Sequence, residues 1–240
     1  MKISLLIMAI VIAPSLMCGC ASQSNYEPVQ AVKLSDSDFT YFPDTQFDRF
    51  MVRDPQVFKQ FDKVIFFPMQ FDKLKIASAA DKELVDSWNG SNWKEMDTIC
   101  QHFDDFALKI FSEREGFTPV KRGGTDVLAI EFSLIKFMPY AKRYKDGGVD
   151  TVGGTSDLSG IGEITVRAVL ANAKTGELVA VIEDTMQVNA RNATTGNLAA
   201  MQNSASPTAQ NAAWRTVFRS WVDDLHEELT RLKSAQIAVQ

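Results

Sequence analysis

The chain has 240 residues, a hydrophobic fraction of 45%, a charged fraction of 23% and a net charge of −5. This balance is ordinary for a globular protein, and the length predicts one domain with a sizeable core. The absence of a basic stripe argues against nucleic acid as a partner. With only two histidines and three cysteines in the sequence, we expect neither a bound metal nor a cofactor.

The first 19 residues have the pattern of a secretory signal. A short positive start precedes an apolar run over residues 3–17, which is too short for the ~20 residues that a transmembrane helix needs. The following Met17-Cys18-Gly19-Cys20 resembles the bacterial lipobox, in which a small residue precedes the lipid-carrying cysteine. Cys20 fits this pattern, whereas Cys18 does not because it follows the bulky Met17. An ordinary cleaved signal or a short uncleaved helix is the alternative.

The lipobox resemblance implies a lipoprotein carrying a diacylglycerol thioether and an N-acyl chain, such as palmitate, on Cys20. Two or more acyl chains anchor a protein stably in a membrane. The next residue is Ala21 and not Asp, which in the usual sorting rule implies the outer membrane, with the domain facing the periplasm. Cys100 then has no intrachain partner, and we expect it to be a small buried hydrophobe.

Residues 20–60 are expected to form a tether and an irregular strap rich in Phe, Tyr and Asp. The strap interpretation lays these aromatic side chains over the core, and a docking surface is the alternative. The folded domain itself is expected over residues 61–235.

Two amphipathic helices are predicted. The first begins near Asn92, whose spacing to Glu95 suggests a capping box, and ends before Gly116. The second begins at Ser206-Pro207 and carries an apolar stripe to Leu232. Weaker helical character covers residues 79–85.

Strands are predicted at residues 64–68, ended by Pro68, and at 117–120, 127–138, 162–173 and 178–189. The turn at Lys174-Thr175-Gly176 predicts that the last two strands pair antiparallel. Asp184 is the exception in the apolar face of the final strand. Because one-sided strands and helices bury their apolar faces together, we predict an α+β two-layer sandwich. It has a mostly antiparallel sheet of four to five strands with two long amphipathic helices packed on one face.

With these elements the chain resembles the bacterial lipoprotein family of domain of unknown function 3313. The lipobox, Leu34-Ser35-Asp36, the strand ending at Pro68, the hairpin over residues 160–180 and the final helix around Trp214 and Trp221 carry this resemblance. It implies an envelope location and this kind of fold, and it implies no catalytic residues.

No recognised catalytic motif is present. The segment His226-Glu227-Glu228-Leu229-Thr230 lacks the second histidine that a zinc protease helix needs four residues after the first. No nucleophile elbow or phosphate-binding glycine loop occurs.

The loop over residues 139–160 is the candidate interaction site. A basic and aromatic group there could touch an anionic glycan, a lipid headgroup or a protein, and a mobile hairpin end kept soluble by its lysines is the alternative. Its members are Tyr140, Lys142, Arg143, Tyr144 and Lys145.

The leading functional hypothesis is therefore a non-enzymatic outer-membrane lipoprotein that binds an envelope protein. The alternative is a lipid- or small-ligand-binding module auxiliary to an envelope transport system, with a groove lined by Trp93, Trp214 or Trp221.

Overall fold

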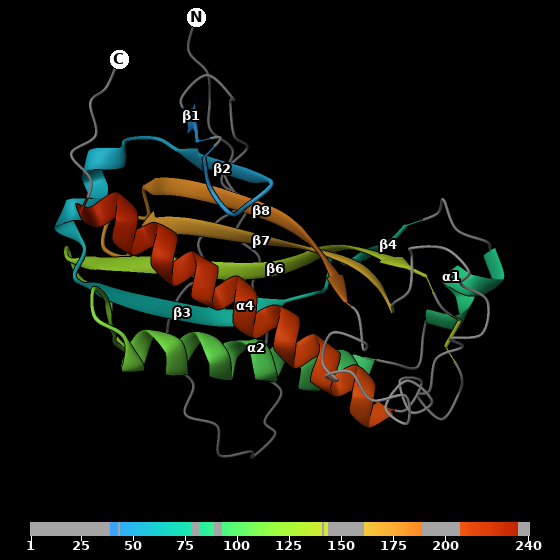
Figure 1. Cartoon of the computed structure of the whole chain (residues 1–240). Coiled ribbons are helices and arrows are strands. Elements are labelled where there is room, and N and C mark those ends of the chain that lie inside the picture. The colour runs from blue at the N-terminus through green and yellow to red at the C-terminus, as the bar shows by residue number, and fades with distance from the viewer. Residues whose placement is uncertain are drawn as a thin grey trace, which may run out of the picture.

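A computed structural model describes residues 39–42, 44–77, 82–88, 93–140, 142–143, 161–188 and 207–234. It shows one mixed sheet with two long helices lying across one of its faces (Figure 1). The predicted α+β sandwich is confirmed. None of the helices in these ranges has the length and apolar character to cross a membrane.

The helices are α1 (Lys82–Trp88), α2 (Trp93–Glu113) and α4 (Pro207–Ser234), with a 3-10 helix, η2 (Pro55–Gln60), before them. The strands are β1 (Thr40–Tyr41), β2 (Arg49–Val52), β3 (Lys63–Gln70), β4 (Lys75–Ile76), β5 (Thr118–Pro119), β6 (Val127–Pro139), β7 (Gly162–Asn172) and β8 (Leu178–Val188). Both long helices and the three long strands lie close to their predicted bounds.

The sheet has eight strands in the order β1-β2-β8-β7-β6-β3-β5, with β4 pairing with β6. The expectation of four to five strands is therefore too low, because β1, β4 and β5 have two residues each. Such segments are too short to show a period of two in the sequence. Strand β3 runs parallel to both β5 and β6, since α2 crosses over between β3 and these strands.

The core lies between the sheet and the helices α2 and α4. Alternate residues of β6 and β7, among them Ile130, Phe132, Val166 and Ala168, point into it and are at most 1% exposed. Its centre is aromatic: the Trp221 ring lies 5.7 Å from that of Phe103 and 5.8 Å from that of Phe132. Such pairs contribute roughly 0.5–1.5 kcal/mol beyond the area that they bury.

The described residues before 61, namely 39–42 and 44–60, belong to this domain. Strands β1 and β2 extend the sheet at the β8 edge, so the expected irregular strap contains regular structure. Three of the aromatic residues in these ranges are buried in the main core, namely Phe47, Phe50 and Phe58. Tyr41, by contrast, is 52% exposed. These three aromatic side chains thus pack on the core and are not available for docking.

Strand β3 does not end at Pro68, contrary to the prediction. The register between β3 and β6 shifts between Phe67 and Gln70, and the strand continues past the proline through this irregularity. Pro68 is exposed and has no N–H to donate to the neighbouring strand. It therefore fits at a bulge, where the ladder of hydrogen bonds is interrupted.

The predicted hairpin between β7 and β8 forms at Lys174–Gly176. The Asn172 side-chain oxygen accepts hydrogen bonds from the backbone N–H groups of Lys174 and Thr175, at 2.9 and 3.2 Å. Gly176 has φ of +70°, a conformation that glycine adopts without the steric cost of a Cβ.

Candidate functional site

The predicted interaction loop begins at the end of β6, where its first residues pack against α1. Lys142 forms an ion pair with Glu83 of α1. The backbone N–H of Arg143 donates to the Ser87 hydroxyl at 3.1 Å. The Arg143 guanidinium carbon lies 5.4 Å from the centre of the Trp88 ring, and the residue is only 8% exposed. These two cations are therefore engaged within the domain.

Tyr140 is also held by its surroundings. Its backbone N–H donates to the Ile161 carbonyl oxygen at 3.0 Å. Burial, followed by a hydrogen bond to the Glu163 side chain, raises the pKa of the Tyr140 phenol to about 12. Tyr144 and Lys145 lie outside the described residues, so the proposed basic and aromatic patch stays a prediction for that part of the loop.

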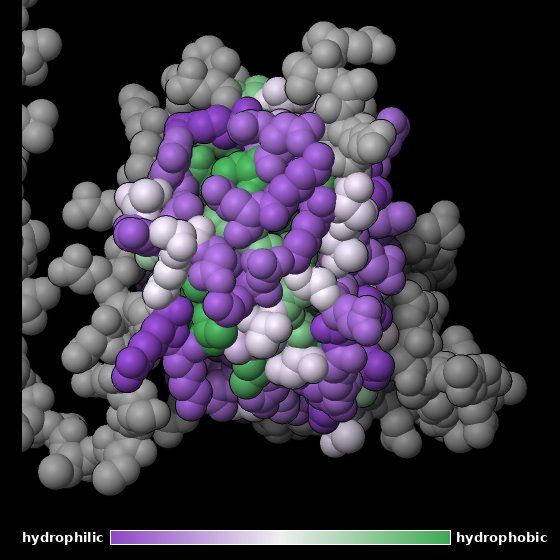
Figure 2. All heavy atoms as spheres, turned by 90° about the vertical axis from the view of Figure 1, so that its left-hand side faces the viewer, coloured by the Kyte–Doolittle hydropathy of each residue, from purple (hydrophilic) through white to green (hydrophobic). Residues whose placement is uncertain are grey.

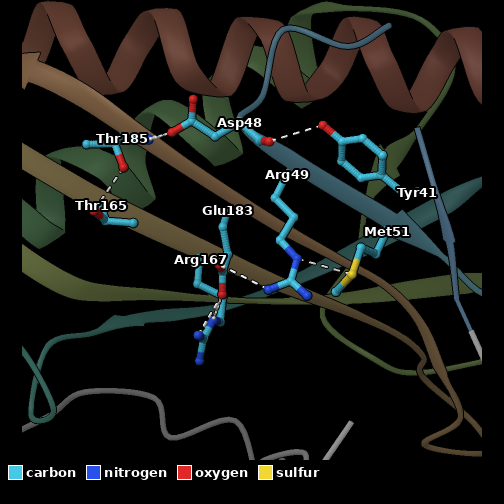
Figure 3. A network of polar contacts seen from close by, with 8 residues as sticks. All are labelled: Tyr41, Asp48, Arg49, Met51, Thr165, Arg167, Glu183 and Thr185. Atoms are coloured by element: carbon cyan, nitrogen blue, oxygen red, sulfur yellow. Dashed lines mark hydrogen bonds and ion pairs between the residues drawn. The ribbon is translucent and has the colours of Figure 1, made fainter. Parts of the chain in front are cut away.

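A second polar surface lies on the sheet face away from the helices. Figure 3 shows Arg167, Glu183 and Arg49 side by side on β7, β8 and β2. Glu183 forms an ion pair with Arg167 at 2.6 Å and a longer one with Arg49 at 3.8 Å. The two arginine side chains are 44% and 43% exposed, so the group presents a net positive charge to solvent.

Hydrogen bonds fix the neighbours of this charged group. The hydroxyls of Thr165 and Thr185 lie 3.1 Å apart across β7 and β8, and the Arg49 Nε donates to the Met51 sulfur at 3.2 Å (Figure 3). Thr165 and Arg167 face away from the core because apolar and polar residues alternate along β7. The participation of Arg49 was not predicted, because no periodicity marks the four-residue β2. We call Arg49, Thr165, Arg167, Glu183 and Thr185 the open-face network.

Asp184 is held where β2 and β8 separate. The Asp48 backbone N–H donates to the Asp184 carboxylate at 3.3 Å, and the Thr185 N–H donates to the Asp48 carboxylate at 2.9 Å. Burial raises the pKa of the Asp184 carboxyl, as do the nearby Asp48 and Asp224 charges. Asp184, the exception in the apolar face of β8, therefore helps to connect β8 with the segment before β2 through these hydrogen bonds.

Cys100 and Asp104 lie one helical turn apart on the inner side of α2. Cys100 is 4% exposed, which confirms that it is buried. Burial raises the pKa of its thiol to about 12, so the thiolate that a nucleophile needs does not form near neutral pH. Asp104 accepts a hydrogen bond from the Met69 N–H at 3.0 Å, and burial raises the pKa of its carboxyl to about 7.

His226 is buried on α4 against Phe111, with the two ring centres 4.8 Å apart. Its Nε2 atom has no hydrogen-bond partner within the described part of the chain. Burial, followed by the Arg114 charge, lowers the pKa of the imidazole. Within the ranges that the structure describes, no three His, Cys, Asp or Glu side chains are placed to hold a metal ion.

The indoles suggested for a ligand groove do not line an open surface. Trp214 and Trp221 are 2% and 1% exposed. Trp214 packs against Phe137 and Phe218, while Trp221 packs against Phe47 and the central aromatic residues of the core. The side chain of Trp93 lies outside the described residues. Two of the three indoles thus fill the core, which disfavours the ligand-binding alternative.

Comparisons with known proteins give similarities to solved structures only. No family model matches the chain, and no curated protein matches it. The PelC dodecamer from Paraburkholderia phytofirmans has a TM-score of 0.33 and 9% identity, covering 69% of this chain and 89% of that one.

Two further structures give similar values. The hypothetical protein CT253 from Chlamydia trachomatis has a TM-score of 0.34 and 7% identity, covering 70% of this chain and 98% of that one. A putative neuraminyllactose-binding hemagglutinin homolog from Helicobacter pylori has a TM-score of 0.29 and 11% identity, covering 72% and 90%. At these TM-scores the similarities carry no conclusion about what this chain does.

Proposed function

We propose that this chain is a bacterial outer-membrane lipoprotein, acylated at Cys20, whose periplasmic α+β domain is a non-enzymatic accessory factor that binds an envelope protein. The observation that carries the proposal is the lipobox, in which Gly19 directly precedes Cys20 after an apolar run. The resemblance to the lipoprotein family of domain of unknown function 3313 agrees with it.

The open-face network is the surface that we assign to the partner. Its two arginine side chains are exposed, yet ion pairs to the less exposed Glu183 hold them in place. A surface ordered in this way loses less conformational entropy on binding than free side chains would. Exposed arginines are also enriched at protein interfaces. We therefore expect a partner surface that supplies carboxylates to Arg49 and Arg167.

The anchor is tested by metabolic labelling with a fatty-acid probe. Labelling should be lost in Cys20→Ser and retained in the matched variant Cys18→Ser. Labelling that survives Cys20→Ser, or that is lost only with Cys18→Ser, would contradict the assignment.

The partner surface is tested by photo-crosslinking in intact cells. A crosslinking residue at Gln187, which is exposed on β8, should trap a defined envelope protein. The matched position is Leu108 on α2, which is 54% exposed and should not trap this protein. Arg167→Ala should weaken the Gln187 adduct, while Lys109→Ala, which removes an exposed cation from α2, should leave it unchanged. Adducts of the chain only with itself, or equal adducts from both positions, would refute this surface.

A further inference from the structure

Two turns at one end of the sheet carry three exposed cations that have no acidic partner among the described residues. Lys121 and Arg122 precede β6, and Lys174 lies in the turn between β7 and β8. The acidic residues of the same turns are neutralised. Asp126 pairs with Lys63 at 2.6 Å, and Glu177 pairs with Arg53 at 3.2 Å. In a chain of net charge −5, these turns therefore have a local excess of positive charge.

The two turns are in direct contact. The backbone N–H of Ala173 donates to the Val127 carbonyl oxygen at 3.0 Å. A Cβ on Gly123 would lie 3.0 Å from the Ala173 carbonyl oxygen, so the two turns are too close here for a residue with a side chain. Lys121 and Arg122 are thus placed beside Lys174, and we call these three residues the basic corner. Figure 2 looks onto this end of the molecule, where hydrophilic residues surround smaller apolar areas.

The chain enters the described structure at the same end. Phe39 packs against the small cluster of Met51, Leu178 and Val181, and its ring centre lies 5.4 Å from the Arg53 guanidinium carbon. Arg53 in turn pairs with Glu177 in the turn that holds Lys174. The segment that comes from Cys20 therefore reaches the domain next to the basic corner.

From these observations we infer that the basic corner faces the membrane and binds anionic phospholipid headgroups of the leaflet in which Cys20 is anchored. This inference rests on the proposed acylation of Cys20. The 18 residues between Cys20 and Phe39 could span up to roughly 60 Å, so an anchor alone does not determine which side of the domain faces the bilayer. Three cations next to the entry point supply that orientation, because a lysine or arginine close to an anionic membrane surface strengthens binding about fivefold.

The binding test uses the non-acylated chain 21–240, which contains every helix and strand of the fold. Its partitioning is measured on vesicles of phosphatidylcholine alone and with added phosphatidylglycerol. We expect binding only with the anionic lipid, and a decline as salt screens the surface. Neutralising the basic corner should reduce the partition coefficient by roughly a hundredfold. This variant is Lys121→Gln, Arg122→Gln, Lys174→Gln.

A matched variant removes the same charge from the opposite end of the sheet. Lys136 is nine residues along β6 from its start at Val127, or about 30 Å away, and pairs in register with Lys75 of β4. The control is Lys73→Gln, Lys75→Gln, Lys136→Gln, all at exposed positions. It should change the partition coefficient less than fivefold. Equal loss in both variants, no preference for anionic vesicles, or binding to an acidic protein without vesicle binding would refute the inference.

Orientation is tested on the acylated chain in vesicles. The buried Cys100 does not compete for a thiol-reactive fluorophore, so a label can be placed at Thr125→Cys beside the basic corner or at Lys73→Cys at the far end. A quencher on the lipid headgroups should quench the first label and not the second. If the fatty-acid probe does not label Cys20, the proposed anchor is wrong, and vesicle binding of the non-acylated chain can still be measured. Normal acylation with equal quenching at both positions would overturn this inference alone.

Discussion

The carboxyl of Asp104 on α2 is partly buried beside the irregularity of β3, so its ionisation should affect the stability of the fold. It accepts the Met69 N–H at 3.0 Å, and burial raises its pKa from 3.8 to about 7. Asp104→Asn keeps an oxygen for the Met69 N–H and removes the charge. We therefore expect the variant to be more stable than the wild type wherever the wild-type carboxyl is ionised.

The direction of the pH effect follows from proton binding. Between pH 4 and 7 the folded protein holds a proton on Asp104 that the unfolded chain has released. The free energy of unfolding therefore falls as pH rises through this window. One pKa unit corresponds to about 1.4 kcal/mol, so a rise in pKa from 3.8 to about 7 amounts to about 4 kcal/mol at pH 8. Asp104→Asn should recover this amount at pH 8 and almost nothing at pH 4.

Urea unfolding of the chain 21–240 at several pH values measures the difference between wild type and variant. Contributions from all other groups cancel in this difference. The control is Asp105→Asn, which removes the same charge from an exposed neighbour on α2 and should shift stability by less than about 0.5 kcal/mol. A variant that is less stable at pH 8, or a difference that does not change with pH, would mean that Asp104 is ionised in the folded protein.

Three further predictions concern other parts of the fold. Because the pKa of His226 is lowered in the folded protein, the unfolded chain binds a proton at this imidazole first as pH drops below 6.5, and the free energy of unfolding should fall. Unfolding curves of His226→Gln should lack this fall in stability. Phe47→Ala should cost about 3–5 kcal/mol and alter the fluorescence of Trp221, whose ring lies 5.3 Å away, whereas Tyr41→Ala should cost less than about 0.5 kcal/mol. Gly176→Ala should lower stability by about 1–2 kcal/mol in denaturant titrations, since no atom lies within 4 Å of the added Cβ and the cost is that of a positive φ alone.

The long elements could be predicted because their apolar residues repeat over many positions. The two long helices and β6, β7 and β8 have 11 or more residues each, enough for a period of 3.6 or 2 to emerge. Strand β2 has four residues, and its place in the sheet depends on its pairing with β8, which no local pattern encodes. The same holds for Lys142 and Arg143. Their basic character suggested a free patch, while their contacts with Glu83 and Trp88 depend on how α1 packs.

The polar residues that interrupt apolar stripes share a structural cause. Asp184 lies where the pairing of β2 and β8 ends after Arg49 and Glu183. In a continued ladder Phe47 would face Thr185, but the Asp48 carboxylate accepts the Thr185 N–H instead, and Asp184 accepts the Asp48 N–H in return.

At the irregularity of β3, a carboxylate likewise replaces a strand partner. Asp104 reaches from the neighbouring helix α2 and accepts a hydrogen bond from the Met69 N–H of β3. A backbone N–H left without a strand partner in the interior is costly, and a carboxylate that accepts from it offsets part of the cost of its own burial. An acidic residue within an otherwise apolar stripe can therefore mark the point where a strand ladder ends or shifts register. For this chain, that interpretation accounts for Asp104 and Asp184 without assigning either of them to catalysis.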